Sequence, residues 1–123
     1  MLPNLNQMTI TADDHYYAGV DLFGEKLYDQ AIAAYREALA LNPAFSDALH
    51  GIAQANYAKE DFVAAIAAAR EILALDPNDV LAWTVISRSY QRKGMVPEAE
   101  EAAAKARILG WKKQLQAGKT AGI

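Results

Sequence analysis

The chain has 123 residues, of which 53% are hydrophobic and 22% charged, so it can fill the core of one domain and is not a disordered tail. It has no cysteine, which excludes disulfides and thiolate chemistry, and its net charge of −3 is too close to neutral to indicate a nucleic-acid partner. No stretch approaches the ~20 apolar residues of a membrane span, and residues 1–10 lack the features of a secretory signal, so we expect a cytoplasmic protein.

The charge is distributed unevenly along the chain. Residues 1–43 carry six acidic and two basic side chains, whereas residues 96–123 carry three acidic and five basic ones. Opposite charges at the two ends would favour head-to-tail contact between copies of the chain, and chance variation on solvated helix faces is the alternative interpretation.

The sequence repeats itself with a period of 34 residues. Residues 31–43 (AIAAYREALALNP) align with residues 65–77 (AIAAAREILALDP), and most of the aligned positions are identical. A third copy begins near Val80 and has Ala99 where the other two have Ala31 and Ala65. A period of this length, with apolar residues at helical spacing, predicts two helices in each unit.

These repeats define the expected organisation of the chain. Residues 1–11 form an apolar lead without helical periodicity, which either packs on the first repeat or binds a partner. A single domain follows over residues 12–116, with repeats at about 12–45, 46–79 and 80–113, and residues 117–123 are expected to be a flexible tail. The predicted helices cover residues 12–24, 28–42, 45–58, 62–76, 79–93 and 96–110, and the last continues to about residue 116 as a C-terminal extension.

The unit resembles the tetratricopeptide repeat. The resemblance rests on the 34-residue period, on small residues at fixed positions in the paired helices, and on the prolines that follow Asn42 and Asp76. The small residues are Gly19, Ala53 and Ser87 from the first helices and Ala31, Ala65 and Ala99 from the second. This resemblance implies an all-α, right-handed α-solenoid of three helix-turn-helix repeats that binds other proteins. Other helical-hairpin repeats, such as the Sel1-like type, are the structural alternative, with a longer usual period.

In such a solenoid the first helix of each pair lines the concave side. By helical phase, this predicted groove also includes Asp13, Asp47 and Leu81, and its main candidate residues are Tyr16, Val20, Phe23, His50, Gln54, Tyr57, Thr84, Arg88, Gln91 and Arg92. Because aromatic residues and arginine are frequent binding hot spots, we expect the groove to take a segment with apolar anchors and an acidic residue near Arg88 and Arg92. The alternative is that the aromatic residues are partly exposed packing residues.

One role of the resembled family is not expected here. Family members that bind chaperone tails hold a C-terminal carboxylate with Lys, Arg and Asn side chains. The matching positions in this sequence are Tyr16, Val20, Gly51, Leu81 and Val85. None of these side chains donates strongly to a carboxylate.

The last predicted helix carries an apolar stripe at its C-terminal end. Ile108, Trp111 and Leu115 are three and four residues apart, so they share one side of a helix. We expect this stripe to fold onto the third repeat. The alternative is an exposed apolar end, used for dimerisation or for docking on a larger partner.

No motif for catalysis or for a cofactor is present. His15 and His50 are not at equivalent repeat positions and have no ligand at metal-binding spacing, and the sequence has no glycine-rich phosphate loop. We therefore expect a protein-interaction module without enzyme activity, metal or cofactor: an adaptor, scaffold or chaperone that binds a protein or peptide in its groove. The alternative function is a structural subunit of a larger complex, docked through its ends.

Overall fold

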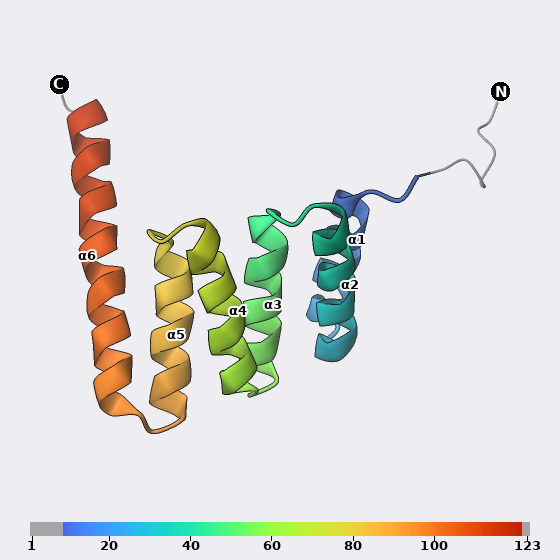
Figure 1. Cartoon of the computed structure of the whole chain (residues 1–123), viewed down its shortest axis with the longest axis horizontal. Helices are drawn as coiled ribbons and strands as arrows, with labels where there is room; N and C mark the ends of the chain where they lie inside the picture. Colours follow the sequence, from blue (N-terminus) through green and yellow to red (C-terminus); the bar gives the residue numbers. More distant parts are fainter. Residues whose placement is uncertain (1–8, 122–123) are drawn as a thin grey trace.

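The computed structural model describes residues 9–121, with side chains described through Gly118. Within this range the chain forms helices and no strand (Figure 1). The helices are α1 (Ala12–Gly24), α2 (Tyr28–Leu41), α3 (Ser46–Ala58), α4 (Phe62–Leu75), α5 (Val80–Arg92) and α6 (Val96–Ala121). The prediction of six paired helices is therefore confirmed, and the predicted lead lies almost entirely outside the described residues.

Each helix packs on the next one along the chain, and the pairs follow one another in a row (Figure 1). The first helices also touch one another, because α3 contacts both α1 and α5. Among the described residues, the backbones of the second helices α2, α4 and α6 do not approach one another in this way, although Arg36 of α2 forms an ion pair with Glu71 of α4 at 3.2 Å. The helices therefore lie closer together on the side of α1, α3 and α5, which makes this the concave side of the solenoid.

The turn inside each pair has the same backbone conformation in all three repeats. Lys26, Glu60 and Gly94, which are 34 residues apart, have φ values of 63°, 66° and 78°. Left-handed backbone suits glycine and costs other residues roughly 1–2 kcal/mol. The N–H groups of Leu27, Asp61 and Met95 each donate to a carbonyl in the last turn of the preceding helix, at 2.9 Å, as in a Schellman end. The period of the sequence is thus also a period of the backbone.

Local hydrogen bonds fix three of the helix starts. Thr11 forms a capping box with Asp14: the Thr11 N–H donates to Asp14 Oδ2 at 2.9 Å, and the Asp14 N–H donates to Thr11 Oγ1 at 3.2 Å. These bonds lower the pKa of Asp14. The carboxylates of Asp61 and Asp79 accept from backbone N–H groups at the starts of α4 and α5. The predicted capping box is therefore present.

The last helix is longer than predicted. From the sequence we expect this helix to end at about residue 116 and a flexible tail to begin at residue 117. Instead α6 continues to Ala121, so this expectation is wrong for residues 117–121. Gln116, Ala117 and Lys119 are good helix formers, no proline follows Pro97, and Gly118 alone costs the helix only about 1 kcal/mol relative to alanine.

The core is built mainly from alanine and isoleucine, so the helices approach closely. Tyr35 is the large exception: its ring is buried between α1 and α3. A Cβ atom at Gly19 of α1 would lie 2.6 Å from this ring, and one at Gly51 of α3 would lie 2.5 Å from it. Both glycines are therefore required by the ring, since no side chain fits between it and either backbone.

At the interface between the second and third repeats, the larger side chain comes from the other helix. Thirty-four residues after Tyr35 and Gly51, the chain has Ala69 and Val85, and both are buried. The volume that Tyr35 supplies from α2 in the first interface is thus partly supplied by Val85 from α5 in the second. In each interface a small residue on one helix faces a larger one on the other, because the space between the helices holds only one large side chain.

This exchange predicts a non-additive pair of substitutions. Tyr35→Ala alone should lower the free energy of unfolding by about 3 kcal/mol through the cavity that it leaves, and Gly51→Val alone by about 1–3 kcal/mol through overpacking. The double variant should be more stable than the sum predicts, by at least about 1 kcal/mol, because valine enters the space that the ring vacates. Urea unfolding followed by circular dichroism measures this coupling, and strictly additive losses would show that the two positions do not share one space.

Candidate functional site

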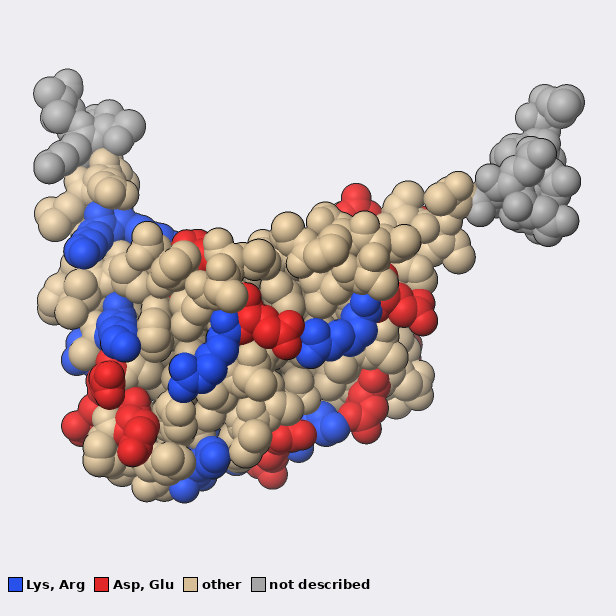
Figure 2. All heavy atoms as spheres, viewed as in Figure 1, with Lys and Arg blue, Asp and Glu red and all other residues tan. Residues whose placement is uncertain are grey.

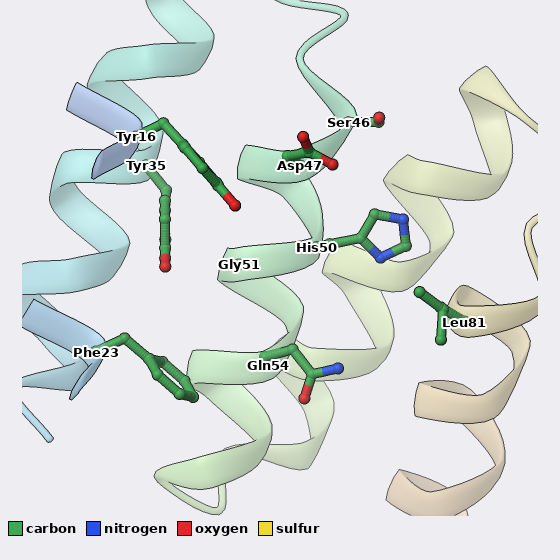
Figure 3. A pocket seen from close by; sticks show the side chains of 9 residues that line it. All are labelled: Tyr16, Phe23, Tyr35, Ser46, Asp47, His50, Gly51, Gln54 and Leu81. Carbon is green, nitrogen blue, oxygen red and sulfur yellow. The ribbon is translucent and has the colours of Figure 1, made fainter. Parts of the chain in front are cut away.

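An open hollow of about 470 Å³ lies on the concave side of the solenoid, between α1, α3 and α5. Figure 3 shows the side chains that surround it. They come from all three repeats: Tyr16, Phe23, Tyr35, Ser46, Asp47, His50, Gly51, Gln54 and Leu81. The first repeat supplies an aromatic wall, and α3 supplies a wall of mostly polar side chains.

The aromatic wall consists of rings that hold one another in place. The ring of Tyr16 lies 5.2 Å from that of Phe45 and 5.8 Å from that of Tyr35, centroid to centroid. Burial raises the pKa of Tyr16, and the carboxylate of Asp47 raises it further. Burial also raises the pKa of Tyr35, with a smaller contribution from Tyr16. Both hydroxyls therefore keep their protons at neutral pH and can donate a hydrogen bond to a bound group.

His50 ties the polar wall to the third repeat. Its Nε2 lies 2.9 Å from Oδ2 of Asp79, while Oδ1 of the same carboxylate accepts from the Ala82 N–H at 2.8 Å. Because an ionised carboxylate only accepts hydrogen bonds, Nε2 carries the proton in this pair. One aspartate thus caps α5 and also fixes the orientation of the histidine at the edge of the hollow.

The lining side chains give the hollow an acidic character. Asp47 is exposed at its rim, Asp79 lies directly behind His50, and no lysine or arginine is among the lining residues. A bound segment with a cationic group next to an apolar side chain would match this arrangement, because the cation meets Asp47 while the apolar side chain meets the aromatic wall.

Six of the predicted groove residues line this hollow: Tyr16, Phe23, Asp47, His50, Gln54 and Leu81. Sequence reasoning did not include Tyr35, Ser46 or Gly51, which complete it. A signal for the floor was present, since glycine at position 51 corresponds to Tyr17 and Val85 in the other repeats. That comparison could have marked Gly51 as a place where a neighbouring side chain approaches the backbone.

The other predicted groove residues do not line the hollow. Arg92 belongs to a separate cluster: its Nη2 lies 2.6 Å from Oε1 of Glu60, and its guanidinium lies 4.9 Å from the ring centroid of Phe62 and 6.0 Å from that of Tyr57. The hydrogen bond that Arg92 donates to Glu60 raises the pKa of Arg92, with a further contribution from Tyr57. The basic end that we expected is therefore partly neutralised within the chain.

The remaining groove candidates are placed more simply. Val20 and Arg88 are exposed, and the hydroxyl of Thr84 donates to the carbonyl of Val80, one turn earlier. Gln91 is exposed and borders a separate, smaller hollow with Val96 and Ala99 of α6. The structure therefore concentrates the candidate site at α1 and α3 and leaves the α5 residues at its margin.

The apolar stripe of α6 is exposed. Ile108, Trp111 and Leu115 have 47%, 59% and 67% of their surface accessible. The expectation that this stripe folds onto the third repeat is wrong. At 3.6 residues per turn, these residues lie on the side of α6 opposite Ala99 and Ala102, which are buried.

Within residues 9–121 there is no group of three or more His, Asp or Glu side chains that could hold a metal ion. In the same part of the chain, no helix has the length and apolar character needed to cross a membrane.

Comparisons with known proteins agree with this architecture. The family model of the tetratricopeptide repeat matches residues 12–45. A comparison with curated protein sequences gives no match. A crystal structure of MamA superimposes with a TM-score of 0.82 at 26% identity, over 89% of this chain and 64% of the MamA chain, so this chain spans less than two thirds of that protein.

Two further solved structures share the fold at lower identity. The translocator chaperone SycD of Yersinia enterocolitica type III secretion, in an alternative dimer, has a TM-score of 0.77 and 17% identity, over 95% of this chain and 92% of SycD. The second tetratricopeptide domain of Spaghetti (RPAP3), bound to the HSP90 peptide SRMEEVD, has a TM-score of 0.74 and 20% identity, over 80% of this chain and 92% of that domain. The all-α solenoid of helix-turn-helix repeats is confirmed.

The exposed stripe makes a prediction about stability. Replacing Trp111 by glutamate should change the free energy of unfolding by no more than about 0.5 kcal/mol, because the side chain lies outside the core. Thermal unfolding of the variant and the wild type measures this difference. A loss of several kcal/mol, of the size expected for a buried tryptophan, would show that the stripe is packed.

Proposed function

Because this chain belongs to the tetratricopeptide-repeat family, we propose that it binds a segment of another protein in the hollow between α1, α3 and α5. It then acts as an adaptor, a scaffold or a chaperone. The observation that carries this proposal is the hollow itself: an aromatic wall faces a polar wall where the first helices of all three repeats meet. Concave sites of this kind, lined by rings with a few directed polar groups, are where protein surfaces bury an anchor side chain.

The structures that share the fold support the class of partner. One of them holds an HSP90 peptide and another is a translocator chaperone. The charge of the hollow argues for a different kind of segment here, since its lining has no cationic side chain and has Asp47 at the rim. We propose a segment with a large apolar anchor next to a lysine or arginine.

The rings determine how the anchor is held. Tyr16 and Phe23 lie on α1 and Leu81 lies on α5, so an apolar side chain that enters between them is enclosed from both ends of the hollow (Figure 3). Tyr35 and Gly51 form the floor, where the ring occupies the space that a side chain at Gly51 would need. Such an anchor gains both burial and ring contacts, which is typical of a binding hot spot.

A second candidate function is assembly into a larger complex through the ends of the solenoid. The observation that favours it is the exposed stripe of Ile108, Trp111 and Leu115 on the last helix. This candidate does not require the hollow, and it is distinguished from the first by which surface loses binding when it is altered.

Selection from a library of random peptides displayed on phage tests the main proposal. We expect the wild-type chain to enrich sequences that combine an aromatic or large aliphatic residue with a neighbouring lysine or arginine. Asp47→Lys should weaken the binding of an enriched synthetic peptide by about tenfold or more, because it reverses the charge at the rim. Fluorescence anisotropy of the labelled peptide measures the affinity.

Asp21→Lys is the matched control. It makes the same charge change on an exposed residue of α1 that does not line the hollow, so it should leave the affinity nearly unchanged. Equal losses of affinity in the two variants would show that the effect comes from the overall charge of the chain and not from the position of Asp47. Enrichment of acidic peptides, or no loss with Asp47→Lys, would contradict the proposed site.

A further inference from the structure

The outward side of α6 is a surface that the proposed hollow does not use. Ile108, Trp111 and Leu115 form one line along this helix, on the side that faces away from α5. α6 lies at one end of the row of helices and its C-terminal part projects past α5 (Figure 1). No described helix covers this line, so its side chains are accessible to a ligand at this end of the solenoid.

The charge of this helix is separated along its length. Glu98, Glu100 and Glu101 lie near its start, and after Glu101 the sequence has five basic side chains and no acidic one. Figure 2 shows this separation over α6, with acidic atoms toward the Val96 end and basic atoms toward the C-terminal end. The apolar line therefore lies in the basic part of the helix.

Most of these basic side chains are available to a ligand. Lys105 is engaged, because its Nζ lies 3.6 Å from Glu101 and 4.5 Å from the ring centroid of Trp83. Arg107, Lys112 and Lys113 are exposed, and among the described residues no ion pair holds them. By helical phase, Lys112 lies on one side of the apolar line and Arg107 on the other.

A further repeat or a second α6 fits this surface poorly. Glu100 and Arg107 stand at the positions that Ile66 and Leu73 hold in α4, so α6 lacks the apolar ridge that receives a following helix. Two copies paired through α6 would also bring Arg107 and Lys112 of both chains together, and like charges in contact are unfavourable. The occupant should therefore be anionic.

We infer that the outward face of α6 from Arg107 to Leu115 binds the surface of a membrane that contains anionic lipids. The face is a convex ridge on a single helix, and a ridge fits a plane better than it fits a peptide segment, which needs a groove. Tryptophan favours the headgroup region, with leucine and isoleucine inserting beside it, and the cations pair with the phosphate groups. The helix lies along the membrane and does not cross it.

Vesicle binding by the full chain tests this inference. Vesicles of phosphatidylcholine mixed equally with phosphatidylglycerol should sediment with the chain, and binding to vesicles of phosphatidylcholine alone should be at least about tenfold weaker. Added salt should weaken the binding to the anionic vesicles, because the cations act at the surface. In a Trp83→Phe background Trp111 is the remaining tryptophan, and its emission should shift to shorter wavelength on binding.

Three variants assign the effect to this face. Trp111→Glu, and separately the pair Arg107→Glu with Lys112→Glu, should each reduce partition to anionic vesicles by about tenfold or more. Val63→Glu is the matched control, since it places a carboxylate on an exposed apolar position of α4. Sedimentation of the wild-type chain carries the test even if Trp83→Phe alters the fold.

Several outcomes would overturn the inference. These are an absence of binding, equal binding to neutral vesicles, or equal losses with Val63→Glu and Trp111→Glu. Concentration-dependent association without lipid that Trp111→Glu abolishes would instead assign the face to a second copy of the chain. Failure here leaves the proposed hollow unaffected, because none of these variants changes a residue that lines it.

Discussion

The contact of the Tyr35 ring with Gly19 and Gly51 is the constraint on which the first interface depends. The ring fills the space in which any side chain at either glycine would come within 2.6 Å of it. The second interface fills the equivalent space with Ala69 and Val85, so the repeats share a backbone and differ in which helix supplies the volume. The hollow follows from this choice, because the tyrosine forms a floor where α3 contributes no side chain of its own at Gly51.

The fold was largely predictable from the sequence because its signals are local and repeated. The helix ends at Asn42 and Asp76 and the cap at Thr11 are each determined by residues within a few positions of them. The 34-residue period then repeats such local signals along the chain. The same period recurs in the left-handed residues of the three turns, including Lys26 and Glu60, whose side chains do not indicate that backbone. The extent of α6 was not predictable, because helix formers and a single glycine leave its end weakly specified.

The site was only partly predictable because it depends on pairs that are distant in sequence. Helical phase places Tyr16, Phe23 and His50 on the concave side, but it does not show that Glu60 holds Arg92 or that Asp79 holds His50. Phase also groups Ile108, Trp111 and Leu115, and it places them opposite Ala99, so their exposure follows once Ala99 is assigned to the packed side of the helix. The two surfaces that emerge have opposite charge, since Asp47 borders the hollow and Lys112 borders the stripe, so they suit different ligands.

The central claim is that the hollow over Gly51 is where a partner segment binds, and amide chemical-shift mapping tests it most directly. A peptide selected by the wild-type chain is titrated into the isotope-labelled protein, and two-dimensional spectra locate the affected backbone amides. The account predicts that the largest changes occur at Tyr16, Gly51 and Gln54, with Trp111 unaffected. Changes confined to residues 108–115, or to the exposed side of α4, would contradict it.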